Sequence, residues 1–289
     1  MNNVFRNNHD DLKPRNAFEG HLDIEIHTYE NMTMTTTKLY DALIIGGGPA
    51  GLSVALGLGR QSRSCLIISH KHHRNDGIEA SHAVLGQDHI HPQTILARAW
   101  EQIARYSNTS YVEAEITSIQ RQKIVHWKGR DGFTVGCKDG RSWIGRTLVL
   151  ATGIKDVMPD LEGYQENWPR NIYQCLFCDG WERRSSEKAI LSFPTPRLMD
   201  LKVASMALGQ DPTRNGDGSA KVTMLTNGPW KSETVDPCFA KQLEAIMARG
   251  VKLDQRKVSK LEDAGSGREG VYVHLTDTQD NTERVFSVF

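Results

Sequence analysis

The sequence predicts an α/β protein with two domains, each a mainly parallel sheet wound with helices. The chain has 289 residues, which is long enough for about two domains with a hydrophobic core in each. Strand, glycine-rich turn, helix and strand follow one another between Tyr40 and Ile68. A second strand–helix–strand pattern runs from Lys188 to Thr226. Such alternation is typical of βαβ units and therefore of a parallel sheet.

Charge and cysteine content exclude several classes of protein. Lys+Arg and Asp+Glu both number 35, so the net charge is zero and indicates neither a nucleic-acid nor a membrane partner. Five cysteines are too few for a disulfide scaffold, and an odd number fits a reducing compartment. The uncharged run from Ala42 to Gly59 is not read as a membrane span, because glycines and Pro49 interrupt it. We therefore expect a cytoplasmic protein.

The first βαβ unit carries glycines where a phosphate could rest. Tyr40 to Ile45 is a predicted strand, and GGGPAG at 46–51 then opens a helix that reaches about Arg60. Glycines in a G-x-G-x-x-G turn allow a tight turn, close approach of the backbone to a pyrophosphate, and close packing of helix on strand. The helix N-terminus then faces the phosphates.

The second strand of this unit departs from the usual pattern. It ends in Ser69 and His70, where an Asp or Glu normally holds the ribose hydroxyls. A hydroxyl or an imidazole replaces the carboxylate there, or ribose binding is weaker. His70, His72 and His73 look metal-like, but no carboxylate or thiol shares their spacing, so we predict no metal site.

Composition divides the rest of the chain. Residues 1–37 are polar and without a period, so we expect a disordered leader. Residues 38–158 form the first predicted domain, which ends with a strand and the small-residue turn Ala151-Thr152-Gly153. Residues 159–280 form the second, and residues 281–289 are expected to lead back to the first.

Cys175 and Cys178 form the pair of thiols that carries the predicted chemistry. Three residues apart at a helix start, their Cβ atoms would lie roughly 5–6 Å apart, and a small closure makes a disulfide. A helix start also favours a thiolate, and Asp179 is placed to move a proton to or from sulfur. A reversible dithiol/disulfide couple is favoured. Zinc would need further ligands that the three other, solitary cysteines do not supply, and two inert buried thiols are the remaining alternative.

In this order, the motifs resemble the low-molecular-weight thioredoxin reductase family of flavoproteins. They are GGGPAGLS at 46–53, ATG at 151–153 and CLFCDG at 175–180, and the similarity covers about residues 39–285. The sequence also resembles the fungal dithiol oxidases of the gliotoxin and holomycin type. Those carry a Cys-x-Phe-Cys-x-Gly motif, an Arg-Asn after the second strand (here Arg74-Asn75) and a downstream histidine (here His82).

The resemblance implies two Rossmann-like domains of the FAD/NAD(P)-binding type, a three-layer ββα architecture and a homodimer. It implies FAD on the first domain, with Cys178 facing the flavin and Cys175 meeting the substrate. The residues implied to contact this cofactor are Gly46, Gly48, Pro49, Ala50, Gly51, Ser69, His70, Arg74, Asn75, His82, Ile116, Ala151, Thr152 and Gly153.

Two further features depart from the family pattern. The turn at 192–196 of the second domain has no glycine and two prolines, which argues against NADPH and favours an oxidase. The family's C-terminal Gly-Asp segment is not found, since Gly216-Asp217 lies in a polar loop. The FAD domain is therefore expected to lack its C-terminal return.

The predicted function is FAD-dependent oxidation of a small dithiol metabolite to its disulfide through Cys175 and Cys178, with oxygen as acceptor. Two alternatives stay open. One is an NADPH-dependent reductase of the thioredoxin reductase type, and the other is a non-catalytic protein with an FAD/NAD(P) fold.

Overall fold

The structure is a computed structural model that describes residues 38–289 except 196, 211–220, 231–236, 266–269 and 277–280. The predicted leader at 1–37 and the Gly216-Asp217 pair lie outside the described residues. The described residues form two six-stranded sheets with helices, which confirms the predicted α/β class.

The first sheet has the order β3-β2-β1-β6-β5-β4. Strands β1, β2, β3 and β6 are parallel to one another, whereas β4, β5 and β6 form an antiparallel meander. The bounds of its elements are β1 (Leu39–Ile45), α1 (Pro49–Arg60), β2 (Cys65–Ser69), α2 (Pro92–Ile103), β3 (Thr109–Glu113), β4 (Ile116–Ile124), the 3-10 turn η1 (Val125–Trp127), β5 (Arg130–Cys137) and β6 (Ser142–Leu150).

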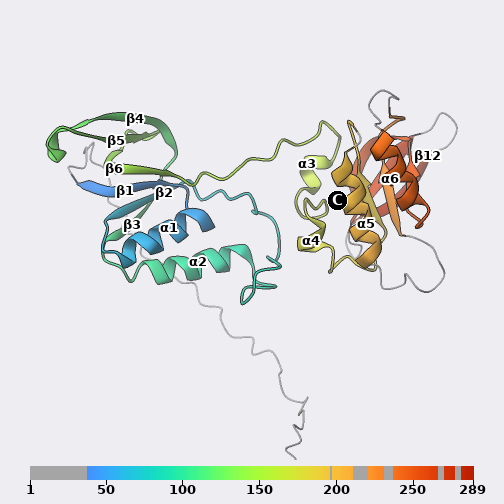
Figure 1. Ribbon diagram of the computed structural model, residues 1–289, viewed down its shortest axis with the longest axis horizontal. Coiled ribbons are helices and arrows are strands. Elements are labelled where there is room, and N and C mark those ends of the chain that lie inside the picture. Colours follow the sequence, from blue (N-terminus) through green and yellow to red (C-terminus); the bar gives the residue numbers. More distant parts are fainter. Residues whose placement is uncertain (1–37, 196, 211–220, 231–236, 266–269, 277–280) are drawn as a thin grey trace, which may run out of the picture. The chain divides into compact units, whose positions relative to one another are not determined.

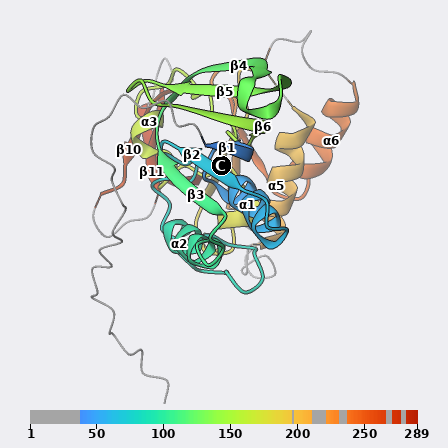
Figure 2. The same cartoon turned by 90° about the vertical axis from the view of Figure 1, so that its left-hand side faces the viewer.

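Side-chain alternation along β1 and β2 builds a three-layer ββα arrangement (Figures 1 and 2). Ile44 and Ile67 point to one face, where they pack with residues of α1 and α2 such as Leu52. Leu43 and Leu66 point to the opposite face, where they pack under the meander. Successive residues of a strand face opposite sides, so a strand covered on both faces reads as a continuous apolar run. This is why 42–45 and 65–68 carry no polar residue.

Two glycines of the first turn are required by packing. Gly46 has a φ of +111°, and a Cβ built on it would overlap the carbonyl oxygen of Ala151. A Cβ on Gly51 would overlap the carbonyl oxygen of Gly46. The turn therefore sits directly against the ends of β1 and β6, and α1 starts at that edge of the sheet.

The second sheet has the order β10-β11-β12-β7-β8-β9. Strands β7, β8 and β9 are parallel, and β10, β11 and β12 are antiparallel. The bounds of this part are α3 (Tyr164–Asn167), α4 (Leu176–Asp179), β7 (Lys188–Leu191), α5 (Leu198–Gln210), β8 (Val222–Leu225), α6 (Pro237–Met247), β9 (Lys252–Asp254), β10 (Lys257–Asp263), β11 (Val271–Thr276) and β12 (Asn281–Val288).

The last strand corrects one prediction. Residues 281–289 were expected to lead back to the first domain, but β12 pairs with β11 and, in parallel, with β7. Phe286 and Val288 are buried in one apolar cluster with Val271 and Val273, so their alternation fits the second sheet. The second domain therefore extends to Phe289.

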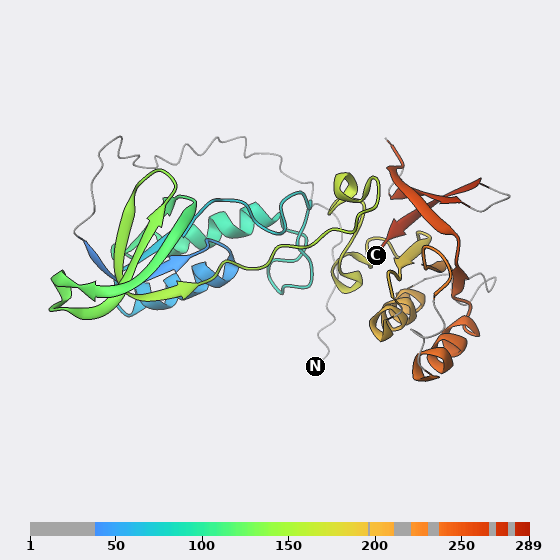
Figure 3. The same cartoon turned by 90° about the horizontal axis from the view of Figure 1, so that it is seen from above.

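Helices α5 and α6 lie on the same side of the second sheet, drawn gold and orange in Figure 3. They bury Leu201, Ala204 and Phe239 against Ile190 and Met224 of β7 and β8. A separate cluster on the β10–β12 side includes Leu225 and Val258. Among the described residues, no helix combines the length and apolarity needed to cross a lipid bilayer.

The cysteines outside the CxxC pair differ in burial, which predicts a labelling pattern. Burial raises the pKa of the Cys65 thiol to about 11, and Cys137 is buried too, whereas Cys238 is exposed. Because the thiolate is the reactive form, we expect iodoacetamide to modify Cys238 at least about 100-fold faster than Cys65 in the folded, oxidised protein. Peptide mass spectrometry over time measures this ratio. Equal labelling of both in native buffer would contradict the described packing.

Candidate active site

The two cysteines of the CxxC motif are joined in a disulfide, with their Cα atoms 5.3 Å apart. Cys175 is the N-cap of α4, and its sulfur accepts the backbone N–H of Cys178 at 3.2 Å. Helix α4 is a single turn, so the helix dipole that the sequence suggested contributes little. A direct N–H to sulfur hydrogen bond stabilises negative charge on Cys175 instead.

The disulfide lies beside exposed apolar side chains. Phe177, between the two cysteines, is 68% exposed, and Trp181 is 59% exposed. Cys175 and Cys178 are half-buried, and Leu176 between them is buried under α5. Buried Leu176 holds the disulfide in place, and the exposed apolar side chains next to it can contact an apolar thiol compound.

Asp179 follows the pair directly and is half-buried. Burial raises the pKa of its carboxyl above the usual value, and Glu182 also raises it, while His82 and Arg183 act in the opposite direction. Burial disfavours the charged form of a carboxyl group. Asp179 therefore holds a proton at a higher pH than an exposed aspartate, as suits an acid–base group.

The start of α1 offers free backbone donors. Its N-cap is Gly48, with no side-chain hydrogen bond, and no acidic residue stands in its first turn. A Cβ on Gly48 would meet only Nδ1 of His73, at 3.9 Å. The backbone at Gly48 is therefore open, and the unpaired N–H groups of a twelve-residue helix point there. This arrangement fits the pyrophosphate of a dinucleotide.

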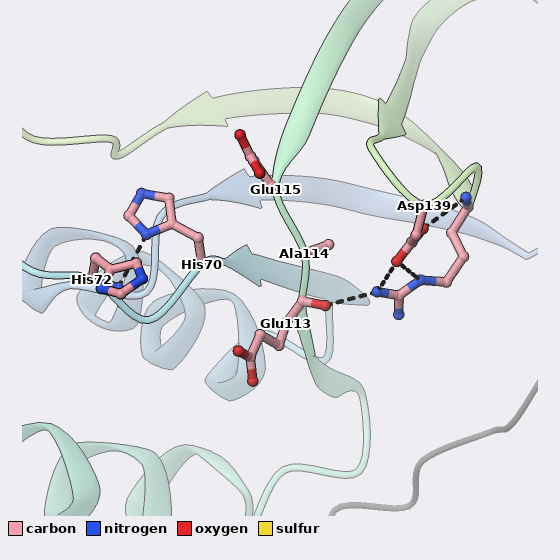
Figure 4. A pocket seen from close by; sticks show the side chains of 7 residues that line it. His70, His72, Glu113, Ala114, Glu115 and Asp139 are labelled. Carbon is pink, nitrogen blue, oxygen red and sulfur yellow. Dashed lines mark hydrogen bonds and ion pairs between the residues drawn. The ribbon is translucent and has the colours of Figure 1, made fainter.

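A cavity of about 500 Å³ lies beside the end of β2, where a ribose acid is usual (Figure 4). His70 stands there with its Nδ1 accepting the N–H of His72 at 3.0 Å. Arg141 donates to the carbonyl oxygen of Glu113 at 2.8 Å. The residues that line the cavity are His70, His72, Glu113, Ala114, Glu115, Asp139 and Arg141.

The remaining predicted cofactor residues divide into two groups. Ser69, Ala151, Thr152 and Gly153 stand with the glycine turn at the ends of β2 and β6, and Ile116 begins β4. Pro49 and Ala50 are the exposed first residues of α1.

Arg74, Asn75 and His82 lie in the segment after β2, in different surroundings. Arg74 is held by both oxygens of Asp156 at 2.7 Å each and by Oε1 of Gln174, the residue before Cys175. His82 faces Glu182, with Nδ1 and Oε1 3.6 Å apart. The Arg74 guanidinium is thus neutralised by a carboxylate, and its hydrogen bonds connect this segment to the CxxC segment.

The corresponding turn of the second domain is filled by its own side chains. Ser192, after β7, donates its hydroxyl to Oδ2 of Asp200 at 2.7 Å, and its carbonyl accepts Nε1 of Trp230 at 3.0 Å. Asp200 stands in the first turn of α5 and is only 3% exposed. This carboxylate is also paired with the Arg197 guanidinium at 2.8 Å, so the serine hydroxyl and the arginine that a phosphate could use already have a partner within the protein.

Sequence reasoning missed several residues of these sites. Glu113, Asp139 and Arg141 line the cavity but were read only as strand and turn residues. Glu182 faces His82 although 100 residues separate them, and no local spacing indicates that contact. Asp200 could have been found from the sequence, because it is a carboxylate at the start of the helix where a dinucleotide phosphate would bind.

The comparisons with known proteins agree with this geometry. Residues 40–191 match the family model for pyridine nucleotide-disulphide oxidoreductases. The chain is 32% identical to the thioredoxin reductase tcpT of Claviceps purpurea, over 86% of this chain and 73% of that protein. It is 32% identical to the thioredoxin reductase sirT of Leptosphaeria maculans, over 84% of this chain and 71% of that protein.

A solved structure of an oxidoreductase from Agrobacterium tumefaciens superposes with a TM-score of 0.70 at 28% identity, over 87% of this chain and 74% of that one. The resemblance that the motifs predicted is confirmed. The chain belongs to the pyridine nucleotide-disulphide oxidoreductase family and is an FAD-dependent disulfide oxidoreductase of the thioredoxin reductase type.

Proposed function

We propose that this protein oxidises a small, apolar dithiol to its intramolecular disulfide, with oxygen as the final electron acceptor. The observation that carries the proposal is the difference between the two nucleotide turns. The turn at Gly48 is open and rich in N–H donors, whereas the turn at Ser192 is closed by Asp200 and Trp230. An FAD site without a matching NADPH site favours a reaction in which the electrons come from a thiol substrate and not from NADPH.

The thiol exchange uses groups of the chain itself. A substrate thiolate attacks the Sγ of Cys175, the S–S bond to Cys178 breaks, and Cys178 leaves as a thiolate. The second substrate thiol, after losing its proton, attacks the mixed disulfide and releases Cys175, so that substrate is oxidised and the protein pair is reduced by two electrons. The half-buried Asp179 takes a thiol proton in these steps.

The pair must then be reoxidised. FAD, when bound, would supply a two-electron acceptor for the dithiol, with dioxygen as the final acceptor that is reduced to hydrogen peroxide. The balance is one dithiol and one O₂ consumed for one disulfide and one H₂O₂ formed. We assign Cys178 to the flavin side and Cys175 to the substrate side, as in the flavoproteins that the motif resembles.

The chain has groups to hold each part of FAD. We assign the pyrophosphate to the N–H groups at Gly48 and the first turn of α1, and the adenosine end to the cavity beside His70. His70 then replaces the usual ribose carboxylate. Ser69, Ile116 and the Ala151–Gly153 turn are assigned to backbone and hydroxyl contacts. Arg74, Asn75 and His82 stay predictions of the resemblance.

The apolar rim of the disulfide supports the substrate class. Phe177 and Trp181 stand exposed on either side of the second cysteine. An apolar dithiol buries this surface on binding, which a charged peptide would not do. A cytoplasmic location and a homodimer stay predictions.

Anaerobic reduction of the flavin tests the function. With the FAD-loaded protein, we expect dithiothreitol to bleach the flavin and NADPH to leave it oxidised, and admission of air to restore the colour with one H₂O₂ per dithiol. Cys178→Ser should lower turnover on the order of 10³-fold or more, because the pair acts as a unit. Cys238→Ser is the matched control, since it removes an exposed thiol outside the pair.

Other outcomes of that experiment point to the alternatives. Bleaching by NADPH would support the reductase of the thioredoxin reductase type. A protein that retains no FAD after incubation would support the non-catalytic reading. Normal turnover by Cys178→Ser would reject the redox role of the pair.

Cofactor binding at the first turn is tested by Gly48→Val. The added side chain has room within the protein, since its nearest neighbour is His73 at 3.9 Å, so the fold should persist. It should block the approach of a phosphate and lower FAD affinity at least about tenfold, equivalent to about 1.4 kcal/mol. Flavin fluorescence titration measures the affinity. The control is Gly57→Val, on the same helix with nothing near its Cβ, and equal loss in both variants would refute the assignment.

The raised pKa of Asp179 predicts a pH dependence. As a base in dithiol oxidation, Asp179 must be deprotonated, so activity should fall as the pH drops through its pKa. Because burial raises that pKa, the acidic limb should lie above 3.8, the usual value of an aspartate carboxyl. Asp179→Asn should abolish this limb and slow thiol exchange by about 10²-fold. An unchanged limb in the variant would assign it to another group. Stopped-flow kinetics across the acid range measure both effects.

A further inference from the structure

Two histidines and two carboxylates gather near the CxxC segment in a cluster to which the thiol exchange assigns no step. They are His82, Asp88 and His89 in the segment after β2, and Glu182, four residues beyond Cys178. One ligand atom from each of His82, His89 and Glu182 can be chosen so that all lie within 4.8 Å of one another. We propose that these three side chains bind a divalent cation of the zinc type.

One ring nitrogen of each histidine lies near the same carboxylate oxygen. Oε1 of Glu182 lies 3.6 Å from Nδ1 of His82 and 3.9 Å from Nδ1 of His89. Ligand atoms around a tetrahedral zinc stand about 3.3 Å apart. The two distances to Oε1 exceed this by about 0.3 and 0.6 Å, and the ligand atoms of all three side chains lie within 4.8 Å of one another, so side-chain rotations would bring them to coordination distance. Two imidazoles and one carboxylate form a donor set that zinc takes in protein sites that keep a fourth position open.

Asp88 lies beside both imidazoles, with its Oδ1 3.6 Å from Nδ1 of His82. Its Oδ2 lies 3.3 Å from Nε2 of His89, the ring nitrogen that faces away from Glu182. The other oxygen of Asp88 accepts the backbone N–H of Ala83 at 2.9 Å, which fixes the carboxylate. A small rotation of either side chain would let this carboxylate accept Nε2–H of His89 and leave Nδ1 as the lone pair for a metal, an arrangement common behind zinc-bound histidines.

Two buried atoms of the cluster lack a hydrogen bond. Nδ1 of His82 and Oε2 of Glu182 are shielded from solvent and have no hydrogen-bond partner within the described residues. Buried polar atoms normally find partners, and a site for an ion is one recognised reason when they do not. A cation would satisfy the His82 nitrogen and neutralise the Glu182 carboxylate.

The motif search could not find this site. The sequence drew attention to His70, His72 and His73, which share a short spacing, and no metal-binding group of the described residues includes them. His82 was read as a cofactor residue from the resemblance. The cation site needs Glu182, which the fold brings from the CxxC segment, so its ligands do not form a local pattern.

Zinc binding to the full-length protein without a histidine tag tests the proposal. The protein is first oxidised, so that Cys175 and Cys178 stay in their disulfide, and exposed Cys238 is alkylated with iodoacetamide. Equilibrium dialysis against zinc chloride should then give one zinc per chain. His89→Ala and Glu182→Gln should each weaken binding by more than about 100-fold, and Asp88→Asn by about 10- to 100-fold.

The control variant is His91→Asn. It removes an imidazole two residues from His89 that caps α2, and asparagine preserves the cap. Zinc affinity should not change. X-ray absorption of the bound zinc should show nitrogen and oxygen ligands, with the scattering pattern of imidazole.

Three results would overturn the proposal. The first is no stoichiometric zinc binding, which would make the cluster a set of ion pairs. The second is equal loss of affinity in His89→Ala and His91→Asn. The third is sulfur in the zinc coordination shell. None of these readouts depends on flavin or on turnover, so they are independent of the oxidase assignment.

Discussion

The close approach of the glycine turn to the ends of β1 and β6 is the constraint on which the first domain depends. Side chains are excluded at Gly46 and Gly51 because backbone carbonyls occupy the space. Gly48, between them, faces open space and caps α1 without any side chain. Gly46 and Gly51 thus fix the position of the helix, and Gly48 leaves the N–H groups of its first turn without a partner side chain. The same packing that seats α1 on the sheet creates the anion site.

The CxxC pair differs from the buried thiols of the chain in the groups that surround its sulfur atoms. Cys65 lies inside β2 and its thiolate is disfavoured by burial, while the Cys137 thiol donates to Asp139 at 2.7 Å. Cys175 instead receives an N–H, which favours its charged form. A hydrogen bond to the thiolate lowers the pKa of a thiol, whereas burial disfavours the thiolate and raises that pKa. Cys65 and Cys137 are therefore less reactive than the CxxC pair, whereas the third free thiol, Cys238, is exposed.

Local patterns were sufficient for the elements that repeat at short range. The βαβ unit at 40–68, the strand ending at Leu150 and the turn of helix after Cys175 follow from periodicity, glycines and spacing. The position of β12 did not follow, because its partners β11 and β7 are set by tertiary pairing. The cavity beside His70 and the contact of His82 with Glu182 also join residues distant in sequence. Sequence spacing carries no information on such contacts until the strand order is known.

The second domain keeps the packing of a nucleotide-binding fold, and the proposal that it takes no NADPH rests on its first turn. A strand, a turn and a helix remain in place at β7 and α5, and their buried faces still form one apolar cluster. What differs is the turn, where Asp200 accepts from the Ser192 hydroxyl and the Arg197 guanidinium, and the Trp230 indole donates to the Ser192 carbonyl. Those internal partners take up the donors that a phosphate would otherwise use, so phosphate binding would have to break them. The domain holds the dithiol segment through Leu176, which packs in that same cluster.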